Sequence, residues 1–394
     1  MKARFVFILL LIIICPVCSR NIPNNECNSA WRARARIMFD PLGVERVNKP
    51  VVLALDFSGL LSKAGLEGRL DERYIRLVEM DSAGTVIDSL VPFQFDRNSD
   101  NPMAGGTLTF IVEGITPPNK TRLYDFYFDT EKNRAGKQEE WFESIVSITD
   151  EVMHEEQISI KINTPSATWY YHKAGAGFAS LEDRNGVDWI SYRPCCESGG
   201  EYRGIPNMWK FHPGLDSCRS VVEADGPLRA RIRSVSLDRR WECVWDIFPH
   251  YALMTLEKAG GTYWFLYEGT PGGTLDVDRD YNVLSNGIRR SVTEDWHGDI
   301  PAPEWLYFGD ESKKRVLYLV HHEDDEHSDQ LWQMRQEMVV FGFGRQYRCC
   351  DTYMSEVPAH FTVGFSEDSS FASVQKAVNN ASKPVKIKVS KLEN

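Results

Sequence analysis

The densest group of side chains able to do chemistry lies in a Gly- and Pro-rich segment, residues 199–214. It contains Tyr202, Arg203, Asn207, Trp209 and His212. A phenol, a guanidinium, an amide and an imidazole in one loop could move protons and neutralise an anion. Loops held by a rigid sheet are where binding and catalytic groups collect. The segment predicts a functional loop; the alternative is a structured turn in which Tyr202 and Arg203 only satisfy backbone carbonyls.

A second group, residues 320–329, combines histidines with acidic side chains. His321 and His322 end an apolar segment that predicts a strand, and His327 follows a run of four acids. Adjacent strand residues point to opposite faces, so at most one of the two adjacent histidines faces a given cleft. We expect His322 to be catalytic. The alternatives are a solvated acidic loop or a metal site.

A metal in this segment would need His321 or His322 together with His327 and a carboxylate. Zinc would lie about 2.0–2.2 Å from such ligands, and the spacing here matches no common ligand signature. We therefore expect no resident cofactor, with a divalent cation as the weaker alternative.

Two aromatic segments supply candidate sugar-binding residues. Residues 295–310 interleave tryptophans and tyrosines with acids, a pattern that suits stacking on sugar rings and hydrogen bonds to hydroxyls, and equally suits the edge of a core. From the two segments we select Trp264, His297 and Tyr307, and we add His250, which precedes the second segment. They join Asn207 and Trp209 as predicted substrate-binding residues.

The second aromatic segment, residues 263–268, alternates in a way that predicts a strand with two different faces. The two sets are Tyr263, Phe265 and Tyr267, and Trp264, Leu266 and Glu268. A central strand that leads into a glycine turn is the simpler interpretation of this segment.

Several common enzyme classes lack their sequence signatures here. The chain contains no GxSxG elbow, no HExxH helix and no GxGxxG turn after a strand, so serine hydrolase, zincin and dinucleotide-binding interpretations have no support. The segment 341–345, FGFGR, lacks the Lys-Ser/Thr of a phosphate loop.

The first nineteen residues have the pattern of a secretory signal peptide. Lys2 and Arg4 precede an apolar run over residues 5–14, and small residues surround a predicted cleavage point after Ser19. The run is too short for a comfortable membrane span, and no later stretch looks transmembrane. We expect the protein to be secreted or periplasmic.

Composition and charge bound the remaining possibilities. The chain has 394 residues, 42% hydrophobic and 26% charged, with a net charge of −11, which is typical of a globular protein. Removal of the signal peptide takes away two cations and no acid. An acidic surface argues against nucleic-acid or anionic-membrane partners. It does not exclude an anionic sugar, because a local group of arginines can outweigh the global charge.

Cysteine usage points to an oxidising compartment. Seven of the nine cysteines lie beyond the signal peptide, and in a secreted protein they indicate disulfides first. They are Cys27, Cys195, Cys196, Cys218, Cys243, Cys349 and Cys350. Seven is odd, so one cysteine is unpaired, and no CxxC spacing supports a zinc ribbon.

Short strand-like segments separated by turns fill the rest of the chain. They predict an all-β protein with a small N-terminal β-barrel or sandwich domain at 33–148 and a large antiparallel β-sandwich, of supersandwich type, at 149–389. Residues 328–338 are the one segment that looks helical. The last dozen residues look like a final strand or a frayed tail.

Two sets of segments carry a family resemblance. Residues 91–96, 106–110 and 124–128 resemble a small β domain that precedes the catalytic part of several lyases and glycosidases. Residues 179–189, ASLEDRNGVDW, resemble the opening of a galactose-mutarotase-like β-sandwich. The chain thus resembles secreted bacterial proteins of polysaccharide degradation, and among them uronate lyases and dehydratases of the ulvan-processing type.

This resemblance implies an anionic poly- or oligosaccharide as partner and β-elimination on a uronic acid as the reaction. The residue roles follow from side-chain chemistry and not from the resemblance: Arg203 and Asn207 would neutralise the carboxylate, His212 or His322 would take the C5 proton, and Tyr202 would protonate the leaving oxygen. Two alternatives stay open. One is a glycoside hydrolase that uses two carboxylates, with Glu268 and one of Asp299, Glu304 or Asp324 as candidates, and the other is a non-catalytic carbohydrate-binding protein.

Overall fold

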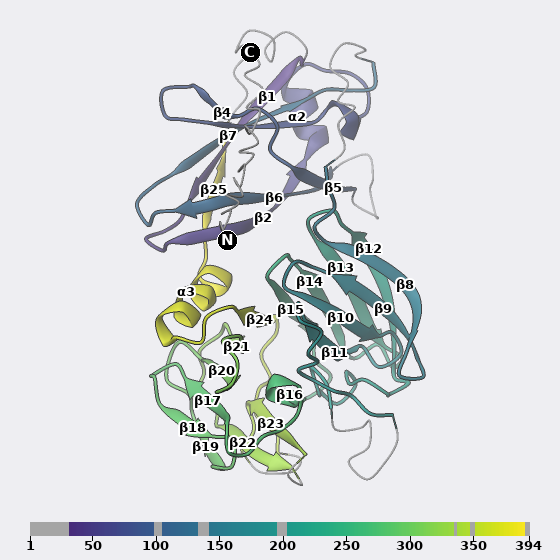
Figure 1. The fold of residues 1–394 in the computed structure, drawn as a ribbon. Helices are drawn as coiled ribbons and strands as arrows, with labels where there is room; N and C mark the ends of the chain where they lie inside the picture. Colours follow the sequence, from purple (N-terminus) through teal and green to yellow (C-terminus); the bar gives the residue numbers. More distant parts are fainter. Residues whose placement is uncertain are drawn as a thin grey trace, which may run out of the picture.

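A computed structural model describes residues 31–97, 105–132, 142–194, 203–334, 337–346 and 351–390. Within these ranges the chain is an all-β protein of antiparallel sheets, which confirms the predicted fold class. Figure 1 shows one sandwich formed mainly by the N-terminal part and a larger assembly of sheets formed by the rest.

The first sandwich consists of a five-stranded sheet, β25-β1-β7-β3-β4, and a three-stranded sheet, β2-β6-β5. Its strands are β1 (Ala33–Asp40), β2 (Arg46–Asp56), β3 (Arg76–Met80), β4 (Val86–Asp88), β5 (Phe93–Arg97), β6 (Gly105–Thr116), β7 (Arg122–Phe128) and β25 (Lys386–Val389). In β1 buried and half-buried residues alternate strictly, as expected of a strand with one face on the core. A short helix, α2 (Phe57–Lys63), and a 3₁₀ turn, η1 (Glu72–Tyr74), connect β2 to β3.

The C-terminal segment returns to this first sandwich. β25 pairs with β1, and the preceding helix α3 (Phe371–Ser382) lies between the two parts of the molecule in Figure 1. Arg46 donates to the carbonyls of Asn379 and Lys383, and Lys49 Nζ lies 2.5 Å from the Asn380 carbonyl, so two basic side chains satisfy the C-terminal end of α3. The predicted domain limits, 33–148 and 149–389, stay a prediction.

The large assembly contains three sheets: β12-β13-β14-β15-β24-β21-β20-β17-β18, β11-β10-β9-β8, and β16-β23-β22-β19. The strands of the nine-stranded sheet are β12 (Cys218–Asp225), β13 (Ala230–Ser236), β14 (Glu242–Ile247), β15 (Tyr251–Lys258), β17 (Asp280–Leu284), β18 (Arg289–Ser291), β20 (Trp305–Asp310), β21 (Val316–His321) and β24 (Ala359–Ser366). The four-stranded sheets comprise β8 (Ser147–His154), β9 (Gln157–Asn163), β10 (Ala167–His172), β11 (Gly177–Asp183), β16 (Phe265–Gly269), β19 (Trp296–Gly298), β22 (Asp329–Met334) and β23 (Met338–Phe343); a 3₁₀ turn, η3 (Pro271–Gly273), follows β16.

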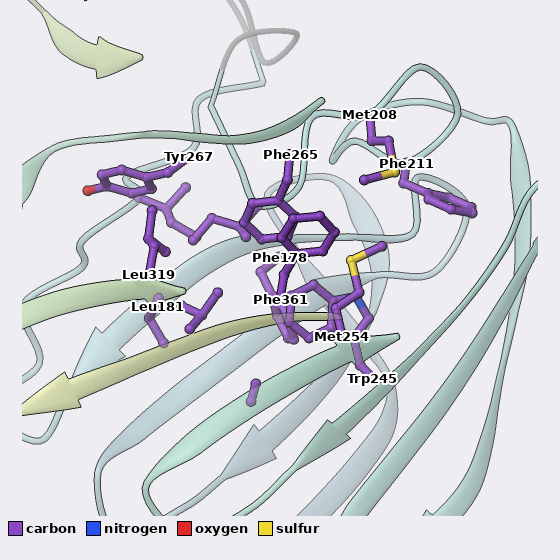
Figure 2. Packing of buried hydrophobic residues seen from close by; sticks show 14 of the residues in the cluster. Phe178, Leu181, Met208, Phe211, Trp245, Met254, Phe265, Tyr267, Leu319 and Phe361 are labelled. Carbon is purple, nitrogen blue, oxygen red and sulfur yellow. The ribbon is translucent and has the colours of Figure 1, made fainter. Parts of the chain in front are cut away.

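One aromatic-rich core joins these three sheets (Figure 2). Phe178 of β11 packs edge-on against Trp245 of β14, with ring centroids 4.7 Å apart. Phe265 of β16 stacks on Phe361 of β24 at 4.4 Å. Both four-stranded sheets therefore bury a face against the nine-stranded sheet, and five tryptophans and eight phenylalanines belong to this core.

The helix predicted at 328–338 is wrong. These residues form most of the hairpin β22–β23, in which Gln330 pairs with Gly342 and Met334 with Met338. The period is two rather than 3.6, because Trp332 and Met334 lie on one face and Leu331 on the core face. The sequence analysis also missed α3, whose buried residues Val374, Val378 and Ala381 have helical spacing.

The described cysteines, Cys218 and Cys243, are buried free thiols, so the expectation of disulfides is wrong for this pair. They lie on β12 and β14, which both pair with β13 between them, so they are not on adjacent strands. The other five cysteines of the predicted mature chain, and the signal peptide, lie outside the described residues. Among the described residues, no helix has the length and hydrophobicity needed to cross a membrane.

Candidate functional site

Strand β16 gives the small sheet β16-β23-β22-β19 two different faces, as the alternation predicted. Phe265 and Tyr267 belong to the large core, whereas Trp264 and Leu266 belong to a separate apolar group with Met334, Met338 and Val340. Glu268 follows Leu266 by two residues, so it lies on this second face. A carboxylate is thus held on the sheet face opposite the main core.

Glu268 contacts two side chains of the loop that was predicted to be functional. Asn207 Nδ2 donates to both carboxylate oxygens at 3.1 and 3.2 Å, and His212 Nε2 lies 3.3 Å from Oε2. His212 and Glu268 are 2% and 3% exposed. We call Asn207, His212, Glu268 and Arg345 the Glu268 cluster.

Backbone contacts fix the loop against the sheet. Gly204 and Glu268 exchange two backbone hydrogen bonds of 2.9 and 3.0 Å, so the loop extends the edge of β16. His212 N donates to the Gly175 carbonyl at 2.7 Å, and a Cβ on Gly175 would lie 2.2 Å from the His212 carbonyl oxygen. This close approach requires glycine at position 175 and sets the place of the imidazole.

Burial and nearby charges act in opposite directions on Glu268. Burial raises the pKa of its carboxyl above the ordinary value, whereas His212, Asn207 and the charge of Arg345 lower it. Burial also lowers the pKa of the Arg345 guanidinium to about 10, which leaves it a cation at neutral pH. The cluster therefore pairs a proton-accepting carboxylate with a fixed positive charge in a water-poor place.

Arg345 lies over the rings of two tryptophans, one of which stacks on a third. Its Cζ is 5.1 Å from the ring centre of Trp264 and 5.5 Å from that of Trp332. Trp209 stacks on Trp264 with centroids 5.9 Å apart and an interplanar angle of 14°. We call Trp209, Trp264, Arg345 and Trp332 the Trp–Arg stack. The Arg345 guanidinium lies over the rings of Trp264 and Trp332, which is a cation–π arrangement.

Trp209 is the exposed end of this stack. Half of its surface is accessible, its φ is +42°, and its Nε1 donates to the Thr262 carbonyl at 3.1 Å. A bulky residue with positive φ is unusual, and backbone strain of this kind is concentrated at active sites and ligand-binding sites. The indole is thus fixed in the open, beside the Glu268 cluster.

The other predicted catalytic residues lie elsewhere or outside the described ranges. Tyr202 is outside the described residues. Arg203 is buried, donates to the Ser191 carbonyl at 2.8 Å and lies 3.6 Å from Glu337 Oε2. The loop thus uses Arg203 to satisfy a backbone carbonyl, the structural alternative stated above, while it brings Asn207 and His212 to Glu268.

His322 does not contact the Glu268 cluster in the described part of the chain. Its Nε2 lies 2.8 Å from Thr362 Oγ1, and burial lowers its pKa to about 4. The adjacent His321 stacks on Phe361 instead, so the two histidines point to opposite faces as predicted. These contacts do not bring His322 to the loop residues with which it was predicted to share the reaction.

The predicted binding residues divide into a central and a peripheral group. Asn207, Trp209 and Trp264 belong to the site just described. His250 is exposed at the β14–β15 turn, and His297 is exposed on β19. Tyr307 is 3% exposed and donates to the Ser369 carbonyl at 3.2 Å, where it packs beneath α3.

The sequence analysis missed Arg345 and Trp332, and it assigned Glu268 only to the hydrolase alternative. The alternation of residues 264–268 was the signal for Glu268. Arg345 follows β23 by two residues, and nothing in the segment FGFGR showed that the β22–β23 hairpin would bring it over Trp264.

A second polar group lies at the end of β21. His321 Nδ1 is 2.6 Å from Glu304 Oε2 and 4.0 Å from Asp325 Oδ2. His327, which was considered as a metal ligand, stacks on Tyr353 instead. We call Glu304, His321 and Asp325 the His321 cluster.

No protein-family model and no curated protein sequence matches the chain. Among solved structures, HI1317 gives a TM-score of 0.40 at 13% identity, over 58% of this chain and 98% of that one. A candidate mutarotase (YeaD) from Salmonella typhimurium gives 0.39 at 12%, over 58% and 96%. A galactose mutarotase related enzyme from Lactobacillus acidophilus gives 0.35 at 9%, over 54% and 99%.

Proposed function

We propose that the protein is a carbohydrate-active enzyme whose reaction takes place at the Glu268 cluster. The observation that carries the proposal is the contact of His212 and Asn207 with the buried Glu268, next to the cationic Arg345. Proton transfer needs a base that a third group orients, and an anionic sugar needs a fixed cation. The half-exposed Trp209 beside these groups offers a flat face for a sugar ring.

The proposed reaction is β-elimination on a uronic-acid-containing oligo- or polysaccharide. When His212 Nε2–H donates to Glu268, the Nδ1 atom is left as the proton acceptor. His212 would take the C5 proton, the C5–H electrons would form the C4–C5 double bond, and the C4–O bond would break. Arg345 would stabilise the charge that develops on the carboxylate, a role given to Arg203 in the sequence analysis.

The leaving oxygen must receive a proton, and Tyr202 stays the candidate for this step. If C4 carries a sugar the enzyme is a lyase, and if C4 carries a hydroxyl it is a dehydratase. Secretion is part of the proposal, because it rests on the signal-peptide pattern of residues 1–19.

The test is to incubate the purified mature protein with a panel of uronate polysaccharides and their oligosaccharides. Elimination creates an unsaturated uronate that absorbs in the ultraviolet. We expect this absorbance to rise with at least one substrate, and the preference for long or short chains to separate lyase from dehydratase. New reducing ends without unsaturation would replace the proposal with hydrolysis, and binding without turnover would replace it with a non-catalytic role.

A further inference from the structure

The His321 cluster, at the end of β21, is distinct from the Glu268 cluster. It combines an imidazole nitrogen with two carboxylates, and the ligand atoms of Glu304, His321 and Asp325 all lie within 4.8 Å of one another. We propose that these three residues bind one divalent transition-metal ion, for which Zn²⁺ is the best fit. Imidazole favours zinc over calcium and magnesium, and two carboxylates balance its charge.

Each carboxylate is already oriented by a backbone group. The Asp325 N–H donates to Glu304 Oε1 at 2.8 Å, so that Oε2 faces His321 Nδ1. The His327 N–H donates to Asp325 Oδ1 at 2.6 Å, and Oδ2 is the atom on the side of His321. One oxygen of each carboxylate is thus held in place, and the other is directed to a common point, as in metal sites whose outer contacts orient the ligands.

The imidazole is fixed as well. Its ring stacks on Phe361 at 4.9 Å with an interplanar angle of 13°, and Phe343 lies on it at 5.7 Å. Glu323 Oε2 lies 3.8 Å from Nε2, on the side of the ring away from the proposed ion. Glu323 itself is held by His360, whose backbone N–H donates to Oε2 at 2.8 Å and whose Nδ1 lies 2.6 Å from Oε1, so its negative charge stays beside the ring.

The charge around the cluster calls for a cation. Glu304 is 2% exposed, and among the described residues its ion-pair partners include no lysine or arginine. Asp324, Asp325 and Glu326 follow in the same loop. A buried carboxylate without a fixed cation is costly, and a metal ion would offset that cost.

The site also has a route for the ion. The side chains of Glu304 and His321 are 1% and 3% exposed, whereas that of Asp325 is 26% exposed. The metal would enter past Asp325 and displace the proton shared by His321 and Glu304. Once bound, it would tie the segment before β20, the end of β21 and the loop before β22 together.

The test is calorimetric titration of the full mature protein, stripped with EDTA and then freed of chelator, with ZnCl₂. Asp325→Asn removes one ligand, and Asp324→Asn is the matched control, because it removes the same charge from the adjacent residue. We expect the wild type and D324N to bind one zinc ion at the His321 cluster, beyond any zinc bound by cysteine thiolates. D325N should bind zinc at this cluster at least tenfold more weakly. Since cysteine thiolates also bind zinc, the difference between the two variants is the quantity that decides.

A second measurement keeps the result independent of folding defects. The melting temperature of the wild type and of D324N should rise with zinc, and that of D325N should not. Equal zinc affinity in D324N and D325N, or absence of binding in the wild type, would show that Glu304 and His321 form only an ion pair. Tighter binding of Ca²⁺ than of Zn²⁺ would overturn the assignment of the metal.

Discussion

Glu268 and Glu304 are both buried glutamates that lie beside one histidine, and their other neighbours differ in charge. Around Glu268, Asn207 donates to the carboxylate and Arg345 contributes a positive charge. Around Glu304, the third side chain is Asp325, a second carboxylate. A glutamate–histidine pair thus lies in a more positive surrounding at Glu268, which would favour an anionic ligand, and in a more negative surrounding at Glu304, which would favour a cation.

Burial raises the pKa of both glutamates, but the charged neighbours act differently. At Glu268 the charges of His212 and Arg345 lower the pKa, whereas at Glu304 the charge of His321 lowers it and the charge of Asp325 raises it. The histidine contacts also differ, with 3.3 Å at Glu268 and 2.6 Å at Glu304. The third neighbour therefore decides which function each pair can support.

The largest expected effect comes from Glu268→Gln and His212→Asn. If Glu268 orients His212 for proton transfer, each substitution should lower kcat by about 10²–10⁴-fold, because general-base catalysis contributes a factor of this size. The double variant should be no slower than about the worse single variant, since the two residues act as one unit. Initial rates of unsaturated product formation measure this.

The control is Glu113→Gln, which neutralises an exposed glutamate of the first sandwich. It should keep the wild-type rate. Full turnover in both E268Q and H212N, with unchanged circular dichroism, would contradict the assignment of the chemistry to the Glu268 cluster.

The next effect in size is the response of stability to zinc in Glu304→Gln. At a zinc concentration 100 times Kd the ion should stabilise the wild type by about 2.7 kcal/mol. E304Q should lose this response, and E268Q should keep it, because the two glutamates belong to separate clusters. Thermal unfolding with zinc and with EDTA measures the response; a zinc response in E304Q equal to that of the wild type would remove the distinction between the pairs.

The fold was largely predictable because the alternation of side chains between the two faces of a strand depends only on neighbouring residues in the sequence. The period of two in residues 263–268 gave both faces of β16 correctly, and with them the face on which Glu268 lies. The same reasoning failed at 328–338, where the hairpin turn at Glu337 hid the period of two. It also passed over α3, where Val374 and Val378 show helical spacing in an otherwise polar segment.

The site was only half predictable, because its contacts are remote in sequence. His212 and Glu268 are 56 residues apart, and the pairing of Gly204 with Glu268 that joins them depends on sheet order. The sequence analysis grouped His322 with the loop only because the proposed elimination needs both a base and a cation. The strand rule placed His321 and His322 on opposite faces but could not say that His321 would meet Glu304, which comes from the segment before the adjacent strand β20.

A smaller effect is expected from Trp209→Ala, which tests whether the exposed end of the Trp–Arg stack holds the sugar. Loss of one stacking face should cost about 1 kcal/mol, or roughly a fivefold rise in KM, with little change in kcat. Trp209→Phe keeps a flat ring and should recover most of the affinity. A fall in kcat at unchanged KM would show that Trp209 positions the Glu268 cluster and does not bind substrate.

The smallest expected effect is on the pH dependence of stability. Glu268 contributes to this dependence in the wild type, and E268Q should lack that contribution. Burial raises the folded-state pKa of Glu268 above 4.5, so the folded protein holds this proton more tightly than the unfolded chain. Stability from this group is therefore present at low pH and is lost as pH rises from 4.5 through the raised pKa. Urea unfolding across this range should show the wild type losing stability relative to E268Q. Parallel curves would mean that His212, Asn207 and Arg345 fully offset the burial, so that the pKa of Glu268 is the same in the folded protein and in the unfolded chain.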